Sequence, residues 1–206
     1  MANSITLAPA ETTVSVQAEE AFIAEQEIPL EQRTDVTVDE LEKLSLPYPA
    51  ELYNGKVVFK KATFAEGVIQ VNIGQEIGNY LESHQIGLVA ANANFRLWPK
   101  RVRESRAPDL SFILQERLPE NLYRYLPMAP DLAIEILSPD DKFMQVMDKV
   151  DEYLLQGVKI VWIVIASTRE VLFCTSQSKY IVRDKLTAPE LLPGFELEVK
   201  DIFIGL

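Results

Sequence analysis

The stretch between residues 132 and 165 constrains the fold more than any other part of this chain, because two apolar runs flank an amphipathic segment. The first run, Leu132-Ala-Ile-Glu-Ile-Leu137, has the length of a strand and contains one acid, Glu135. The second run, Val158–Ile165, is typical of a central strand covered on both faces. A helix predicted over about 142–156 joins the two, which makes the strands parallel. We therefore predict an α/β fold, a mixed β-sheet flanked by helices on both faces.

Two further patterns fill in the fold on the N-terminal side of this unit. An Asn54-Gly55 pair between two apolar runs predicts a β-hairpin over about 50–60. Apolar residues then recur every four positions between residues 64 and 84, which is typical of an amphipathic helix. The sequence thus predicts hairpin, helix and strands ahead of the strand–helix–strand unit.

The net charge of −11 at pH 7 is unevenly distributed along the 206 residues. Ten acids and two bases lie within the first 50 residues, so the rest of the chain is close to neutral. We therefore predict an acidic N-terminal extension over residues 1–44, partly mobile, and a single domain over residues 45–206. A local basic surface on that domain remains compatible with the overall charge.

Composition also excludes several classes of protein. A single histidine and a single cysteine exclude a multi-histidine zinc site and an internal disulfide framework. The sequence has no apolar run of membrane-spanning length and no secretory signal pattern at its start. We therefore expect a cytoplasmic protein that does not cross a membrane.

Two carboxylates mark the predicted site. Asp109 follows Arg106-Ala-Pro at the entry to a predicted strand, and Glu135 lies inside an apolar one. A buried carboxylate is costly unless it is paired or binds a cation, and a pair on neighbouring strands suits Mg²⁺ or Mn²⁺. The alternatives are a turn-capping role for Asp109 and a solvated strand face for Glu135. Asp131, in a second Ala-Pro-Asp turn, is interpreted as part of the turn that leads into the strand rather than as a metal ligand.

An ordered series of motifs resembles the Uma-type putative restriction endonuclease family, which belongs to the PD-(D/E)XK nuclease superfamily. The resemblance covers about residues 45–200 and rests on Glu51-Leu-Tyr-Asn-Gly-Lys-Val-Val58, Asn94-Phe-Arg-Leu97, Arg106-Ala-Pro-Asp109, Pro130-Asp-Leu-Ala-Ile-Glu-Ile-Leu-Ser-Pro139, Asp148-Lys-Val-Asp-Glu-Tyr153 and Trp162-Ile-Val164. It implies a restriction-endonuclease-like core, a Mg²⁺ or Mn²⁺ cofactor, DNA as substrate and a homodimer.

The resemblance also implies which residues form the site. Asp109 and Glu135 match the two metal-binding acids of the superfamily. The superfamily usually has a lysine two residues after the second acid, where this sequence has Leu137. In the Uma-type branch the lysine moves to the following helix, and Lys149 stands at that position. The alternative is that Lys149 lies on a solvent-exposed face of that helix and has no role in the site.

Other candidates are Glu66 and three arginines. Glu66 stands where family members commonly have a histidine, so it is a further candidate metal ligand. The alternative is an acid favoured by the dipole at a helix N-terminus. Arg101, Arg103 and Arg106 are candidate phosphate contacts, against the alternative of solvated loop charges. Arg106 is also a candidate partner for a site carboxylate.

Three functions remain open at this point. The first is a Mg²⁺-dependent DNA endonuclease that uses Asp109, Glu135 and Lys149. The second is a catalytically inactive nuclease-fold protein that binds DNA or another protein. It is favoured by Leu137 in place of the superfamily lysine, by Glu66 in place of the family histidine, and by the acidic N-terminal segment. The third, an enzyme acting on a small phosphorylated substrate, ranks last because the sequence has no glycine-rich phosphate loop.

Overall fold

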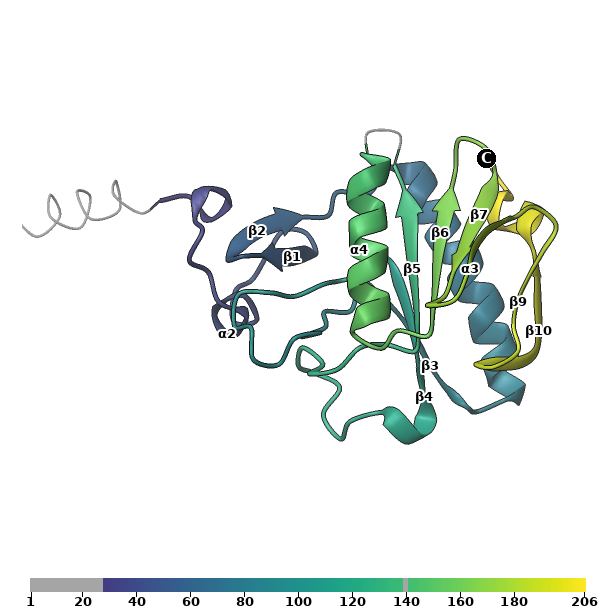
Figure 1. The fold of residues 1–206 in the computed structure, drawn as a ribbon, viewed down its shortest axis with the longest axis horizontal. Coiled ribbons are helices and arrows are strands. Elements are labelled where there is room, and N and C mark those ends of the chain that lie inside the picture. The colour runs from purple at the N-terminus through teal and green to yellow at the C-terminus, as the bar shows by residue number, and fades with distance from the viewer. Residues whose placement is uncertain (1–27, 139–140) are drawn as a thin grey trace, which may run out of the picture.

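A six-stranded sheet forms the centre of the computed structural model, which describes residues 28–138 and 141–206 (Figure 1). The strands of the described residues are β1 (Ala50–Tyr53), β2 (Lys56–Phe59), β3 (Gly87–Ala91), β4 (Leu110–Leu114), β5 (Leu132–Leu137), β6 (Ile160–Ile165), β7 (Glu170–Cys174), β8 (Lys179–Val182), β9 (Lys185–Ala188) and β10 (Leu192–Glu198). The helices are η1 (Leu30–Gln32), α2 (Val38–Leu41), α3 (Phe64–Ser83), η2 (Gln115–Arg117), α4 (Phe143–Leu155) and η3 (Val199–Phe203).

The central sheet has the order β3-β4-β5-β6-β7-β8. Strands β5 and β6 are parallel, and every other neighbouring pair is antiparallel. Helix α4 connects the parallel pair, as Figure 1 shows. The predicted mixed sheet with a parallel strand–helix–strand unit is therefore confirmed.

The alternation of side chains along β5 divides them between the two faces of the sheet. Leu132, Ile134 and Ile136 share one buried cluster with the apolar side of α3. Ala133 belongs to a second cluster, on the side of α4. Successive strand residues point to opposite faces, so Glu135 points toward α4. The two helices thus cover opposite faces of the sheet, as predicted.

Helix α3 begins with a capping box and packs through a regular apolar stripe. The Thr63 hydroxyl accepts a hydrogen bond from the Glu66 amide, and the Glu66 carboxylate accepts one from the Thr63 amide. Ile69, Ile73 and Ile77 are fully buried on one side of the helix. The four-residue spacing explains this burial, because residues i and i+4 lie on the same helix face.

A second layer closes the α3 side of the molecule. The β9–β10 hairpin and η3 contribute their apolar side chains to the same cluster as α3. The Tyr80 hydroxyl donates to the Pro193 carbonyl, and the Asn72 amide donates to the Ile202 carbonyl. These bonds fix α3 between the sheet and the C-terminal segment, and thereby fix the start of α3 near the site.

The β1–β2 hairpin forms a separate small core beside the sheet. Its turn is Asn54-Gly55, with φ values of 49° and 82°, so the predicted hairpin is confirmed. Val36, Val38 and Leu41 pack against this hairpin in a buried cluster of their own. The boundary at residue 44 remains a prediction, and the expected mobility of the extension falls mainly on residues 1–27, outside the described residues.

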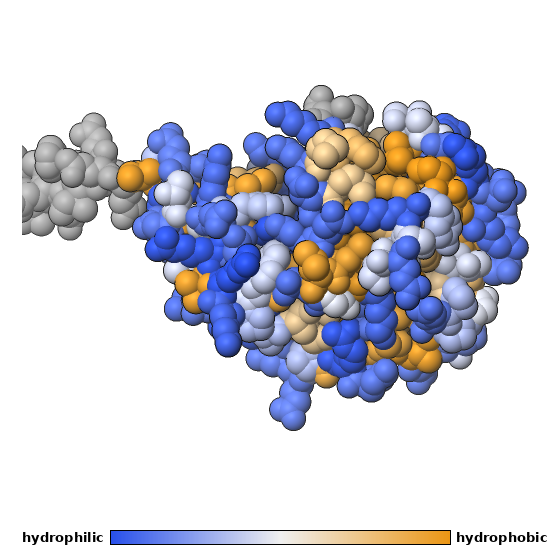
Figure 2. All heavy atoms as spheres, in the orientation of Figure 1, coloured by the Kyte–Doolittle hydropathy of each residue, from blue (hydrophilic) through white to orange (hydrophobic). Residues whose placement is uncertain are grey.

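Among the residues that the structure describes, no helix is both long and apolar enough to cross a membrane. The surface in Figure 2 is mostly polar over the β1–β2 hairpin. Apolar side chains gather at the start of α4, where Phe143 and Met144 are exposed.

Candidate active site

Asp109 and Glu135 lie next to each other on adjacent strands. Leu110 pairs with Ile134 in the antiparallel register of β4 and β5. The same register carried one residue further sets Asp109 opposite Glu135, on the face that α4 covers. The Ile136 amide donates a 2.7 Å hydrogen bond to Asp109 Oδ2, which ties the two strands together at this point. The two predicted acids are thus brought together by strand register.

Helix α4 supplies two further groups to Glu135. The Lys149 ammonium lies 2.7 Å from Glu135 Oε1, and the Tyr153 hydroxyl donates a 2.8 Å hydrogen bond to the same oxygen. These residues are four apart and therefore share one face of the helix. The Lys149 side chain is 12% exposed, which excludes the alternative of a solvated helix face. The structure thus brings Lys149, a residue predicted from the sequence, to the second acid, together with Tyr153, for which the sequence suggested no role.

Glu51 is a third buried carboxylate, which the sequence reasoning missed. It comes from β1, and its Oε1 lies 2.7 Å from the Lys149 ammonium and accepts a 2.7 Å hydrogen bond from the Ala107 amide. The Tyr53 hydroxyl donates to its other oxygen at 3.1 Å. An acid between the buried residues Ala50 and Leu52 is the same signal that singled out Glu135, so it could have been found.

Lys60 is the second missed residue, and it lies between the two predicted acids. Its ammonium is 2.6 Å from Asp109 Oδ1 and 3.2 Å from Glu135 Oε2, and it donates a 2.7 Å hydrogen bond to the Ala107 carbonyl. Lys60 belongs to the short linker between β2 and α3. No motif marks it, because a lysine in a linker is usually solvated.

These contacts change the protonation of the site. Burial raises the pKa of Asp109, and the facing Glu135 carboxylate adds to this effect. Burial alone would also raise the pKa of Glu135, but Lys149 and Lys60 outweigh it and hold that pKa below its usual value. Burial acts to lower the pKa of Lys149, yet Glu135 and Glu51 raise it above its ordinary value. Lys149 therefore remains a cation at neutral pH.

The donor set around Lys60 has the chemistry of a hard-cation site. Two carboxylate oxygens and one carbonyl oxygen, from Asp109, Glu135 and Ala107, surround its ammonium. Mg²⁺ and Mn²⁺ prefer such oxygen ligands, so the residues fit a divalent ion at the position where the ammonium lies. A metal at about 2.1 Å from each oxygen would require the ammonium to leave.

Glu66 is not part of this group. One of its oxygens accepts the capping-box hydrogen bond, and the other is buried without a partner. Within the described residues, no set of three acid, histidine or cysteine side chains converges as a metal site. The capping box therefore supports the helix N-terminus alternative. One turn further along α3, the Gln70 side chain donates a 2.5 Å hydrogen bond to the Asp109 carbonyl.

The arginines divide into two kinds. Arg101 and Arg103 are exposed, whereas Arg106 is 1% exposed. Its guanidinium lies over the Tyr53 ring at 3.6 Å and pairs with Glu104 and Glu152 at 3.1 Å and 2.8 Å. The expectation that Arg106 contacts phosphate or a site carboxylate is therefore corrected. Its buried guanidinium donates its hydrogen bonds to other groups of the protein.

Asp131 takes no part in the site. It is fully buried, it accepts a 3.0 Å hydrogen bond from the Leu114 amide, and it pairs with Arg117 and Lys159. These bonds join the ends of β4, β5 and β6 at the opposite end of β5 from Glu135. This position, directly before β5, agrees with the interpretation of Asp131 as part of the turn that leads into the strand.

A mixed sheet with a parallel strand–helix–strand unit, facing acids on two strands and a lysine on the following helix define a nuclease-like α/β protein. The model of the Uma2 family, described as "Putative restriction endonuclease", matches residues 38–200. The chain belongs to this family, as its motifs suggested.

A solved structure has the same fold. It is a putative nuclease belonging to DUF820 from Anabaena variabilis ATCC 29413, with a TM-score of 0.69 and 23% sequence identity. The match covers 82% of this chain and 97% of that one. A search of curated proteins gave no match.

Proposed function

We propose that this protein is a divalent-metal-dependent endonuclease that hydrolyses phosphodiester bonds in DNA. The observation that carries the proposal is the pair formed by Asp109 and Glu135 on adjacent strands, with Lys149 in contact with the second acid. Family membership and fold independently support a nuclease.

Each residue has a role that follows from its position. Asp109 and Glu135 would hold the metal ion, together with the Ala107 carbonyl. Such an ion polarises a phosphodiester and lowers the pKa of a bound water. Lys149 is held by Glu51 and Glu135, stays protonated, and offsets negative charge that develops on the phosphate.

DNA and a second copy of the chain belong to the same proposal. Arg101 and Arg103 are exposed and can contact phosphates, in which case binding weakens as salt rises. Two active sites are needed to cut two strands, so the proposal includes a homodimer. Sedimentation of the protein with and without DNA tests it, and a monomer in both conditions contradicts it.

Nicking of supercoiled plasmid tests the catalytic assignment. We expect wild type to nick DNA with Mg²⁺ or Mn²⁺ and to stop when EDTA removes the metal. Asp109→Asn and Glu135→Gln keep the size of each side chain but remove the charge that a metal needs, so their rates should fall by about 100-fold or more. Asp148→Asn, at an exposed position beside Lys149, is the matched control and should retain the wild-type rate. Equal nicking by wild type and Asp109→Asn would refute the site.

A second candidate function is a catalytically inactive nuclease fold that binds DNA or protein. The observation in its favour is the Lys60 ammonium, which already contacts both acids without a metal. This candidate predicts DNA binding without cleavage, and the same plasmid assay combined with a gel-shift experiment separates it from the first.

A further inference from the structure

Lys60 occupies the position that a metal ion would need. Its ammonium contacts Asp109 Oδ1, Glu135 Oε2 and the Ala107 carbonyl, which are the three oxygens of the proposed metal site. One cation at this position excludes another, because both need the same oxygens and repel each other.

The attachment of Lys60 allows its side chain to leave. Its backbone amide is fixed to the Pro49 carbonyl, so the Cα stays in place. The side chain is 18% exposed and begins in a linker rather than in a strand or helix. A lysine has four rotatable bonds and readily extends its ammonium into water. The ammonium can therefore withdraw from the site without any movement of the sheet.

Lys149 differs from Lys60 in this respect. It is held from both sides by Glu51 and Glu135, on a helix packed against the sheet. Its ammonium touches Glu135 Oε1, whereas Lys60 touches Oε2. The two lysines thus use separate oxygens of Glu135, and only Lys60 also contacts Asp109.

The charges of the cluster favour the exchange. Glu51, Asp109 and Glu135 set three negative charges against the two ammonium groups, which leaves one negative charge uncompensated. When a divalent ion replaces the Lys60 ammonium, the buried cluster becomes neutral. When an ion and both ammonium groups are present together, the cluster carries a net positive charge.

We infer that Lys60 is a built-in competitor of the metal ion, a tethered cation that closes the site until a divalent ion displaces it. The inference rests on the proposed function, because it takes the metal site as given. A wild-type protein whose metal-competent state is a minor population binds metal more weakly by that fraction. Lys60 therefore sets the metal concentration at which the site becomes active.

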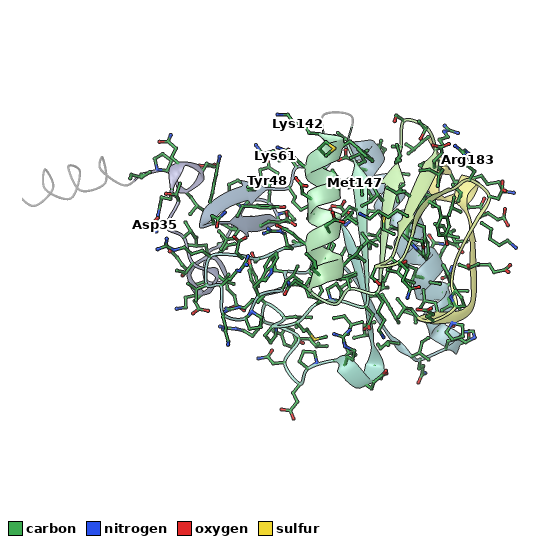
Figure 3. The ribbon with its side chains drawn as sticks, in the orientation of Figure 1. Asp35, Tyr48, Lys61, Lys142, Met147 and Arg183 are labelled. Carbon is green, nitrogen blue, oxygen red and sulfur yellow. The ribbon has the colours of Figure 1, made fainter. Side chains whose placement is uncertain are left out.

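Calorimetric titration of the full chain with Mn²⁺ tests this. Lys60→Met and Lys60→Gln remove the competing charge, and their Mn²⁺ affinity should rise by roughly tenfold or more over wild type. Lys60→Arg keeps the charge and should bind Mn²⁺ as weakly as wild type. Lys61→Met is the matched control, because Lys61 lies over the Tyr48 ring outside the cluster and on the hairpin side of α4 (Figure 3).

A thermal-unfolding readout accompanies the titration. A ligand that binds only the folded state raises its melting temperature, and more so when it binds tightly. Mn²⁺ should therefore raise the melting temperature of Lys60→Met or Lys60→Gln more than that of wild type or Lys61→Met. The gain should disappear in Lys60→Met combined with Asp109→Asn, which locates the bound ion.

The outcomes separate the two proposals. Equal Mn²⁺ affinity in wild type, Lys60→Met and Lys60→Gln overturns the competition and leaves the proposed function intact. Weaker binding in the folded Lys60 variants than in wild type also overturns the competition, and makes Lys60 a supporting residue. No Mn²⁺ binding in any folded variant overturns the metal site itself, and the proposed function with it.

Discussion

At the scale of single residues, acids in or beside apolar strands were the most useful indication of the site in the sequence. Glu135 in an apolar strand and Asp109 at a strand entry could be found from the sequence, because burying a carboxylate needs a reason. Lys149 could be found only through the family pattern. Lys60 could not be found, because its contact with both acids depends on where the linker between β2 and α3 lies relative to β4 and β5, which local sequence does not encode.

The lysine on α4 also has a structural role that can be measured. Lys149→Met leaves Glu51 and Glu135 buried without their shared cation, which should lower the free energy of unfolding by about 3–5 kcal/mol. Lys142→Met, one residue before the same helix and exposed, should change it by less than about 0.5 kcal/mol. Urea unfolding followed by circular dichroism measures both. A Lys149→Met protein as stable as Lys142→Met would show that the pairs contribute nothing.

At the scale of elements, the strand–helix–strand unit, the Asn-Gly hairpin and the long helix α3 were all predictable. Each depends on a local pattern: an apolar run, a turn dipeptide or a four-residue spacing. The covering of α3 by the β9–β10 hairpin was not predictable, because it depends on contacts between segments more than 100 residues apart, such as Tyr80 with Pro193. The position of Glu51 beside Lys149 likewise depends on a contact between distant segments, although the acid itself could have been singled out from the sequence.

The capping box of α3 offers a test at this scale. Thr63→Ala removes the hydroxyl that accepts from the Glu66 amide, which should cost about 0.5–2 kcal/mol of stability. Thr63→Ser keeps an oxygen at the same place and should stay close to wild type. Denaturant midpoints of the three proteins decide the point, and a Thr63→Ala midpoint equal to that of Thr63→Ser contradicts it.

At the scale of the whole molecule, Arg106 joins parts that lie far apart in the chain. Its guanidinium donates to the Leu52 carbonyl in the hairpin and to Glu152 on α4, and it stacks on the Tyr53 ring. It therefore connects the small hairpin core to the layer that contains the site. The sequence offered only its position before Asp109, and so its role in holding the molecule together was not predictable.

Loss of this connection should lower the stability of the whole fold. Arg106→Met leaves the buried Glu104 without its guanidinium partner, so we expect a loss of about 3–5 kcal/mol in unfolding free energy. Arg103→Met, three residues earlier and exposed, should lose less than about 0.5 kcal/mol and is the matched control. Thermal unfolding measures both variants. Similar melting temperatures would mean that hairpin and sheet are held together by other contacts.

The alternating faces of β5 determine which changes in chain length this protein can absorb. An insertion among the exposed residues 120–124 of the connector between η2 and β5 leaves the register of β4 and β5 intact. One residue inserted inside β5 ahead of Glu135 would turn that acid toward the isoleucines of α3 and move an apolar residue to Lys149. Relatives of this chain should therefore vary in length at this part of the connector. Within β5 they should differ only by an even number of residues, which keeps each side chain on its face of the sheet.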